Sequence, residues 1–270
     1  MKADQRILLT GATGGIGRAV ARALLPRART LLLVGRDAGK LRALRDELLA
    51  VSPDVDVRTV AADLASEAGR SAVADAADLV RDGINVLINN AGVGALAWFE
   101  EQTAQDIERI VQTNLVATML LTHRMLPALH RQPAARVINV GSILGDIGHP
   151  GSVAYCASKF ALRGFTEALR RELAGSRIRL QYLAPRATRT ELNSPAQNAL
   201  NAELGVASDA PEQVAVELLA LLDGARPERH LGWPEKLFVR INRLLPRLVD
   251  ASLAKQLAVI RRHAQQGVKP

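Results

Sequence analysis

Three side chains, Ser142, Tyr155 and Lys159, have the types and the spacing to move a proton to or from a substrate oxygen. Tyr155 and Lys159 are four residues apart, which places them on one face of a helix. A free phenol has a pKa of ~10, and an ammonium group ~4 Å away, at an effective dielectric of ~20, favours the phenolate by ~4 kcal/mol. Such a preference would lower the pKa of Tyr155 by ~2–3 units, while the Ser142 hydroxyl could hold the substrate oxygen. The three residues therefore predict acid–base catalysis in which Tyr155 exchanges the proton.

A glycine-rich turn near the start of the chain could hold a nucleotide. Between a short apolar run and an amphipathic helical pattern stands the sequence TGATGGIG, residues 10–17. Glycines permit a tight turn and a close approach to a pyrophosphate, whose charge the N-terminus of the following helix stabilises. This is the place of the phosphate-binding turn in a dinucleotide-binding fold. The predicted cofactor-binding residues of the turn are Gly11, Thr13, Gly15, Ile16 and Gly17.

The residues after the second apolar run bear on the choice of dinucleotide. This run ends at Val34 and is followed by Gly35, Arg36 and Asp37. A carboxylate directly after this strand binds a ribose 2′-hydroxyl, whereas an arginine accommodates a 2′-phosphate. Gly35 occupies the expected position of the acid and Arg36 the next one, so we predict NADP. NAD remains the alternative if Asp37 is the discriminating acid.

Strand and helix patterns alternate along the chain and predict one parallel sheet. Buried parallel strands read as continuous Leu/Ile/Val runs, and regular β-then-α alternation predicts a Rossmann-like, doubly wound α/β fold of about seven strands. The predicted strands are Arg6–Leu9, Thr30–Val34, Val55–Ala61, Val86–Asn89, Arg136–Val140, Ile178–Leu183 and a weak one at Arg229–Leu231. The predicted helices lie near Ile16–Leu24, Ala38–Ala50, Glu67–Arg81, Thr103–His130, Val153–Ala174 and Pro211–Leu222.

Composition excludes several classes of protein. Of 270 residues, 48% are apolar and 23% charged, which is ordinary for a globular domain. Of the net charge of +8, residues 233–270 carry +6, from eight basic and two acidic side chains. Only 3% of residues are aromatic, too few for a stacking platform, so we expect no nucleic-acid partner. The lone cysteine, Cys156, and the absence of a signal-peptide pattern near Met1 predict a cytoplasmic protein. The five histidines show no metal-ligand spacing, and no metal is expected.

Taken together, these motifs resemble the short-chain dehydrogenase/reductase family in its single-domain form, over about residues 5–232. The resemblance implies hydride transfer between a nicotinamide and a carbonyl carbon, with Tyr155 exchanging the proton on oxygen and Lys159 also holding the nicotinamide ribose. It assigns Asn114 to a catalytic tetrad with Ser142, Tyr155 and Lys159. Further cofactor contacts implied by the resemblance are Asp63 and Leu64 at the adenine, Asn90 of the NNAG sequence along the cofactor, and Thr188 and Thr190 near the nicotinamide.

Two departures from the family pattern affect the substrate end. Arg186 replaces a glycine after the sixth strand; it is either a displaced surface side chain, which we favour, or a reader of an anionic substrate group. The usual C-terminal Asp-Gly-Gly turn is missing, so the family's tetramer interface is not assumed. Residues 191–210 correspond to the family's substrate-covering segment. His149 and Asp146 lie between Ser142 and Tyr155 and either line the pocket or stay on the loop surface.

The last 38 residues form a basic amphipathic extension, 233–270, beside a predicted catalytic domain, 1–232. On a helical wheel Lys236, Arg240, Arg243 and Arg247 share one sector and the apolar side chains occupy the opposite arc, with Pro246 splitting the pattern into two helices. The apolar arc either packs on the domain or on a second subunit, which we favour, or lies on an anionic membrane surface through 233–263.

These observations predict an NADP(H)-dependent enzyme that interconverts a carbonyl and a secondary alcohol on an apolar or lipid-like substrate. A homo-oligomer, dimer or tetramer, is expected. The alternative is a dinucleotide-binding regulatory or scaffold protein recruited by its basic C-terminal helices. The intact Ser142, Tyr155 and Lys159 favour the enzyme, because a binding module has no need of them together.

Overall fold

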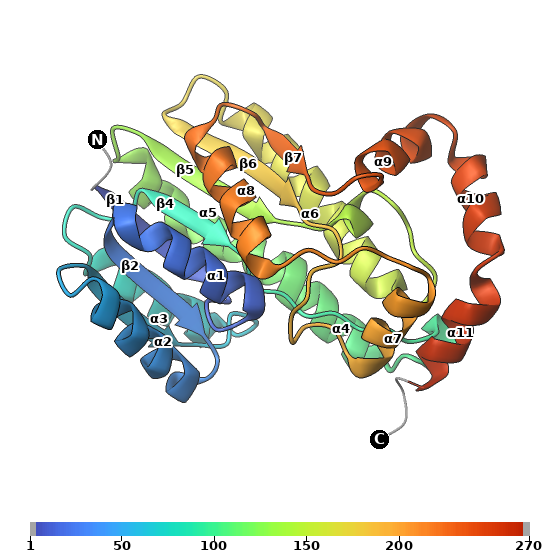
Figure 1. The fold of residues 1–270 in the computed structure, drawn as a ribbon. Helices are drawn as coiled ribbons and strands as arrows, with labels where there is room; N and C mark the ends of the chain where they lie inside the picture. Colours follow the sequence, from blue (N-terminus) through green and yellow to red (C-terminus); the bar gives the residue numbers. More distant parts are fainter. Residues whose placement is uncertain (1–3, 267–270) are drawn as a thin grey trace.

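The computed structural model describes residues 4–266, which form a central parallel sheet covered by helices on both faces (Figure 1). The strands are β1 (Gln5–Thr10), β2 (Ala28–Gly35), β3 (Asp56–Ala61), β4 (Val86–Asn89), β5 (Ala135–Val140), β6 (Ile178–Ala184) and β7 (Glu228–His230). Their order in the sheet is β3-β2-β1-β4-β5-β6-β7, and every pair is parallel. The order reverses at β1, between β2 and β4, so a ligand crevice is expected at the carboxyl ends of β1 and β4. The doubly wound α/β fold is confirmed.

The helices are α1 (Gly15–Leu24), α2 (Ala38–Val51), α3 (Glu67–Asp78), α4 (Ala104–Val111), α5 (Ala117–His130), α6 (Val153–Glu172), α7 (Pro195–Glu203), α8 (Pro211–Asp223), α9 (Glu235–Leu244), α10 (Pro246–Ala254) and α11 (Leu257–Gln266). The predicted helix Thr103–His130 is interrupted, because a π-helical turn, Gln112–Val116, joins α4 to α5. Such turns are often found at functional sites.

Each strand residue faces one of two apolar layers. Ile7 and Leu9 pack into the layer formed with α1, α2 and α8, and Leu8 packs into the layer formed with α3 and α5. Leu31, Leu32 and Leu33 alternate in the same way, and all are fully buried. Successive strand side chains point to opposite faces, so a continuous apolar run is what a sheet covered on both sides requires. This core fixes the sheet edge where the polar motifs gather.

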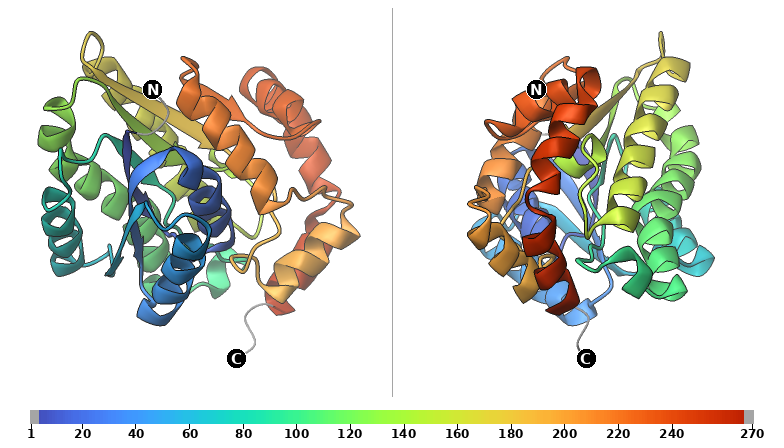
Figure 2. Two further views of the ribbon diagram at one scale, coloured as in Figure 1. Left: turned by 60° about the vertical axis from the view of Figure 1, so that its left-hand side comes forward. Right: turned by 90° about the vertical axis from the view of Figure 1, so that its right-hand side faces the viewer.

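Beyond β7 the chain continues as a strap of three helices, α9, α10 and α11, here called the C-terminal extension (residues 233–266). Figure 2 shows the strap running along the side of the molecule at which the strands end, from α9 near β7 to α11 beside α7. Pro246 is the first residue of α10 and directly follows the end of α9 at Leu244 and Leu245. The predicted division of the extension at Pro246 is therefore confirmed. None of the helices within residues 4–266 has both the length and the apolar character needed to cross a membrane.

Candidate active site

The glycine-rich turn joins β1 to α1, and its glycines are required by close contacts. Gly11 has a φ of +64°, and a side chain there would meet the Ala91 backbone at 2.8 Å. A side chain on Gly17 would collide with the Gly11 carbonyl oxygen, and one on Gly15 would lie 2.6 Å from the Thr190 methyl group. The first amides of α1, at Gly15, Ile16 and Gly17, have no acceptor within their own helix. They are free to donate to a phosphate at this helix N-terminus.

Asn90 and Thr10 brace this turn from the neighbouring strand. The Thr10 hydroxyl accepts hydrogen bonds from the amides of Asn90 (2.9 Å) and Ala91 (3.0 Å). The Asn90 side-chain amide donates to the carbonyl oxygens of Thr10 and Gly11, both at 3.1 Å. The structure therefore places Asn90 against the turn, where it holds the ends of β1 and β4 together.

At the end of β2 the side chains of Arg36 and Asp37 have different surroundings. Arg36 is exposed to solvent. Asp37 is the N-cap of α2, and its carboxylate accepts the Lys40 amide at 2.9 Å, which lowers its pKa. The Thr13 hydroxyl lies against Gly35, 3.1 Å from where a side chain would begin. The carboxylate after β2 is thus engaged with its own helix, whereas the neighbouring guanidinium faces outward.

After β3 the predicted adenine contacts form a short turn. The Asp63 carboxylate accepts the Ala65 amide at 3.0 Å and is otherwise exposed, and Leu64 is buried in the core layer beneath it. This turn is held against the sheet by Leu64 and lies at the same edge as the glycine-rich turn, because β3, β2 and β1 are parallel neighbours.

Ser142 lies two residues beyond β5, where a tight turn begins. Its hydroxyl accepts the Leu144 amide at 3.1 Å and so caps the turn Ile143–Gly145. The Tyr182 hydroxyl packs against this backbone, at 3.4 Å from both the amide and the carbonyl oxygen of Ser142. A side chain on Gly141 would collide with the Tyr182 ring, so this position requires glycine. Tyr182 therefore helps to position the backbone of Ser142 at the end of β5.

Tyr155 and Lys159 project from one face of α6, and burial dominates both. The Lys159 ammonium donates to the Val140 carbonyl oxygen at 3.0 Å and lies 5.7 Å from the centre of the Tyr155 ring. Burial raises the pKa of Tyr155 to about 12, although the hydrogen bond with the Ser142 side chain lowers it. Burial also lowers the pKa of Lys159 to about 8. The expected lowering of the Tyr155 pKa by Lys159 is not found, because the ammonium is directed to a backbone carbonyl oxygen and both groups lose hydration.

Asn114 lies in the π-helical turn and is fully buried. Its side-chain oxygen accepts the Val93 amide at 2.8 Å, and its amide donates to the Val93 carbonyl oxygen (2.9 Å) and the Ser158 hydroxyl (3.0 Å). A side chain on Gly92 would lie 3.2 Å from the Asn114 oxygen and 3.7 Å from the Lys159 ammonium. The NNAG segment, Asn114 and Lys159 therefore meet at one point.

Thr188 and Thr190 follow β6 on a loop that returns to the glycine-rich turn. The Thr188 hydroxyl is buried and donates to the Arg186 carbonyl oxygen at 2.9 Å. The Thr190 methyl group packs on Gly15, so this loop forms the wall opposite α1. The loop thus brings both threonines to the crevice side of the sheet edge.

Arg186 is not the free surface side chain that we favoured. Its guanidinium is mostly buried and donates to Asp209 at 2.7 and 2.9 Å, and it also pairs with Glu235 at 3.3 Å. It lines a pocket together with Lys236, but two carboxylates already pair with its charge. It ties the loop after β6 to the start of α9.

Asp146 is the centre of a cluster that the sequence did not reveal. Its carboxylate is fully buried and meets Arg163 Nε (3.2 Å), His230 Nε2 (2.8 Å) and Arg243. The side-chain amide of Asn242 donates to the Asp146 carbonyl oxygen at 2.8 Å. Burial would raise the pKa of Asp146, but the hydrogen bonds from His230 and Arg243 hold it below its ordinary value. We call these five residues the Asp146 cluster; it anchors α9 to the loop that carries Ser142.

Two more supporting residues escaped the sequence analysis. Ser158 accepts from Asn114 and donates to the Tyr155 carbonyl oxygen at 2.7 Å; its position one residue before Lys159, on the same helix as Tyr155, was the available signal. Tyr182 is one of only two tyrosines in the chain, and its place in a buried strand gave no sign that its hydroxyl reaches Ser142.

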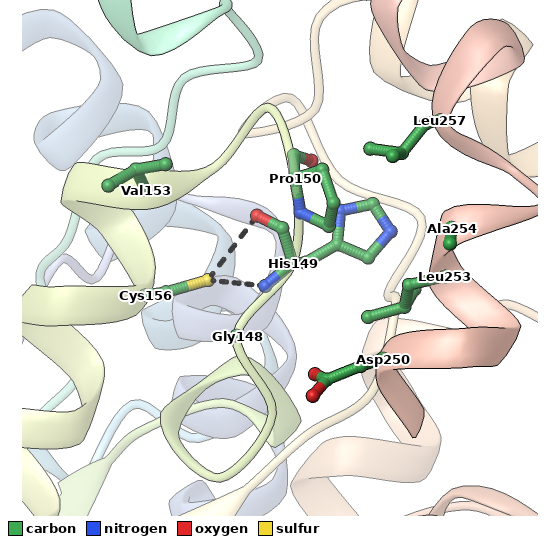
Figure 3. Close-up of a pocket in the computed structure, with 9 residues that line it drawn as sticks. All are labelled: Gly148, His149, Pro150, Val153, Cys156, Asp250, Leu253, Ala254 and Leu257. Atoms are coloured by element: carbon green, nitrogen blue, oxygen red, sulfur yellow. Dashed lines mark hydrogen bonds between the residues drawn. The ribbon is translucent and has the colours of Figure 1, made fainter. Parts of the chain in front are cut away.

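A cavity of about 400 Å³ lies beside the site, between α10 and the loop before α6 (Figure 3). Ser142, Tyr155 and Lys159 do not line it. His149 does, and burial lowers its pKa, so a purely surface position for this residue is wrong. The Cys156 thiol accepts the His149 amide at 3.4 Å, as Figure 3 shows. The lining residues are Gly148, His149, Pro150, Val153, Cys156, Asp250, Leu253, Ala254 and Leu257.

The predicted covering segment, 191–210, contains α7 and is fastened to the last helix. Leu200 packs with Ile260 and Ala264 of α11 and with Leu96. Glu203 pairs with Arg262 and with His263, the latter at 2.7 Å. The segment is therefore clamped by α11.

A family model described as short chain dehydrogenase matches residues 5–201. The chain is similar to the 3-oxoacyl-(acyl-carrier-protein) reductase of Aquifex aeolicus, with 32% identity over 69% of this chain and 75% of that protein. It also resembles the short chain dehydrogenase/reductase of Burkholderia phymatum solved in complex with NAD, with a TM-score of 0.82 and 25% identity over 92% of this chain and 96% of that one. A third relative is Pseudomonas aeruginosa RhlG, solved as an active-site complex with NADP, with a TM-score of 0.74 and 30% identity over 84% of this chain and 93% of that one.

The fold and the site define an oxidoreductase with a dinucleotide-binding sheet edge. The chain belongs to the short-chain dehydrogenase/reductase family. The family and enzyme class predicted from the sequence are thereby confirmed.

Proposed function

We propose that this chain is an NADP(H)-dependent enzyme that interconverts a carbonyl and a secondary alcohol on an apolar substrate. The observation that carries the proposal is the meeting of Gly92, Asn114 and Lys159 at one point, with the Ser142 side chain close enough to Tyr155 to lower the pKa of its phenol. In this proposal Ser142, Tyr155, Lys159 and Asn114 are the catalytic residues.

The glycine-rich turn suits a dinucleotide. Gly11 and Gly17 are closed to side chains by the protein's own backbone, and the free amides of Gly15, Ile16 and Gly17 provide donors for the pyrophosphate. When bound, the nicotinamide supplies the hydride for the carbonyl carbon. We place Asp63, Leu64 and Asn90 along the cofactor and Thr188 and Thr190 near its nicotinamide end.

The choice of NADP rests on the end of β2. Arg36 is exposed and available for a 2′-phosphate, whereas the carboxylate of Asp37 caps α2. Since related structures hold NAD or NADP, the ratio of the two dissociation constants is the measurement that decides this point.

Tyr155 is suited to donate a proton. With a pKa near 12 it is protonated at neutral pH, so it can give its phenolic proton to the carbonyl oxygen as the alcohol forms, while Ser142 holds that oxygen. Asn114 holds the backbone after the NNAG segment, and Ser158 holds the backbone of Tyr155. Because Asn114 also donates to Ser158, the two segments keep a fixed position relative to each other.

The cavity beside the site, between α10 and the loop Gly148–Pro150, supports an apolar substrate, because Val153, Leu253 and Leu257 supply much of its lining. The Aquifex relative is named as a 3-oxoacyl-(acyl-carrier-protein) reductase, and a 3-oxoacyl compound is the first class to assay. The decisive experiment compares turnover of a carbonyl panel by wild type and Tyr155→Phe. Turnover that survives this substitution, or cofactor binding with no turnover of any carbonyl, would contradict the proposal and favour a binding protein.

We also propose that the enzyme is a homo-oligomer. Helices α5 and α6 expose Met119, Leu120, Val153 and Phe160, each about two fifths accessible, and burying them against a second copy would stabilise a dimer. Light scattering after gel filtration tests this, with Leu120→Glu and Phe160→Glu expected to give monomers.

A further inference from the structure

Helix α9 presents three of its apolar side chains, Leu237, Phe238 and Leu244, to solvent. These side chains, together with two at the start of α10 and the tryptophan before α9, are between 40% and 79% exposed. We call them the outer ridge: Trp233, Leu237, Phe238, Leu244, Leu245 and Leu248. Contiguous exposed apolar surface of this kind indicates a contact site.

The orientation of α9 is fixed by its opposite face. Val239 is buried in a small apolar cluster with Ile143, Leu162 and Tyr182. One turn later Asn242 and Arg243 enter the Asp146 cluster. At about 100° per residue, the positions of Leu237, Phe238 and Leu244 fall on the side of the helix turned away from these contacts. The ridge is therefore held outward by specific interactions and is not an unpacked inner face.

Three free cations flank the outer ridge. Lys236, Arg240 and Arg247 are exposed, whereas Arg243 is engaged by Asp146. The acid in α9, Glu235, is paired with Arg186. Within the described part of α9 no exposed acid faces these cations; in α10 the exposed acid is Asp250, which lines the cavity. The three cations therefore outnumber the exposed acid beside the ridge.

We propose that the outer ridge docks on an anionic lipid surface. Leucine, phenylalanine and tryptophan side chains enter the boundary between headgroups and acyl chains, and the flanking cations meet the lipid phosphates. A second copy of the chain fits less well, because an apolar contact between two ridges supplies no negative charge for the flanking cations, whereas anionic lipid does. Docking would place α10, whose inner side lines the 400 Å³ cavity, next to the membrane.

The experiment is vesicle flotation of the full-length protein. Vesicles of phosphatidylcholine alone are compared with vesicles that also contain phosphatidylglycerol. We expect binding only to the anionic vesicles. Each cation contributes about fivefold, so Lys236→Gln, Arg240→Gln and Arg247→Gln together weaken binding on the order of 100-fold. The ridge variant, Leu244→Ser with Leu245→Ser and Leu248→Ser, loses more than about tenfold.

A matched control carries Val51→Ser and Leu79→Ser. These side chains are 73% and 75% exposed, as much as the ridge residues, but lie at the ends of α2 and α3. Binding of this control must equal that of wild type. Far-UV circular dichroism and thermal melting establish that each variant is folded, and the charge variant tests the proposal even if the ridge variant does not fold.

Several results would overturn the proposal: no flotation of wild type, equal binding to neutral vesicles, or a ridge variant that binds like the control. Light scattering without lipid gives a separate check. If the ridge variant has a smaller mass in solution than the wild type, the ridge is covered by a second copy. None of these measurements depends on catalysis, so they stand apart from the test of the proposed reaction.

Discussion

Substituting Asp146→Asn removes the charge at the centre of the Asp146 cluster while keeping the size of the side chain. The carboxylate is fully buried against Arg163, His230 and Arg243. Removing one partner of a buried ion pair costs ~3–5 kcal/mol, because the remaining charges are left unpaired. Arg243 is 39% exposed and can recover hydration, so we expect the low end, ~3 kcal/mol.

The assay is thermal unfolding followed by circular dichroism. For a chain of this size ~3 kcal/mol corresponds to a fall in Tm of about 6–12 °C. The control is Asp223→Asn, which breaks the exposed pair with Arg27 and should cost no more than ~1 kcal/mol. Hydrogen exchange should also accelerate in α9, because the cluster is its anchor. If Asp146→Asn melts with the control, and α9 exchanges as in wild type, the reasoning is wrong.

The same substitution makes a prediction about pH. Because the pKa of Asp146 lies below its ordinary 3.8 in the folded chain, its contribution is complete above that ordinary value and is lost as the pH falls through the lowered one. The stability difference between wild type and Asp146→Asn should therefore be constant near neutrality and shrink in acid. A difference that grows on acidification would contradict this assignment.

Three further predictions concern the cofactor, the lysine and the loop before α6. Arg36→Ala should raise the Kd for NADPH by about tenfold or more while leaving that for NADH unchanged, because it removes one charge-assisted contact; equal changes by fluorescence titration would count against it. The pKa of Lys159 is lowered to about 8 from 10.5, so the unfolded chain binds the extra proton and stability should rise by about 3 kcal/mol between these pH values. Lys159→Met should abolish this rise and be more stable than wild type at pH 7 in denaturant titrations. Gly151 has a φ of +77° and would bring a side chain to 3.0 Å from Leu96, so Gly151→Ala should cost ~1–2 kcal/mol, whereas Gly148→Ala, with open space around it, should cost under ~1 kcal/mol; equal losses in the two would refute this reading.

Much of the fold could be predicted because it depends on local patterns. The apolar run at Leu31–Leu33 is typical of a strand covered on both faces, and the spacing of Tyr155 and Lys159 places them on one helix face. The glycine-rich turn also depends on local sequence, since contacts within or next to the turn require glycine at positions 11 and 17. For the same reason the family was recognisable from short motifs.

What could not be predicted depends on long-range pairing. Arg186 pairs with Glu235, 49 residues away in the sequence, and Asp146 pairs with Arg243, 97 residues away. A single sequence does not show which distant charge a side chain will pair with. The helical wheel identified the apolar arc of α9 but not the direction in which it faces, because that direction is set by Val239, Asn242 and Arg243. The pKa of Tyr155 was misjudged for a related reason: spacing shows that the ammonium is near but not that it donates to Val140.

In the proposed enzyme residues 191–210 cover the substrate, so the clamp between α7 and α11 would restrict substrate entry and product release. Any outward swing of α7 must either break the contacts of Glu203 with Arg262 and His263 or carry α11 along. Since α9 is held at the Asp146 cluster, the bending would fall at the two interruptions of the strap, before Pro246 and after Ala254. The rate at which α7 moves away from the site would then depend on α11, some sixty residues further along the chain.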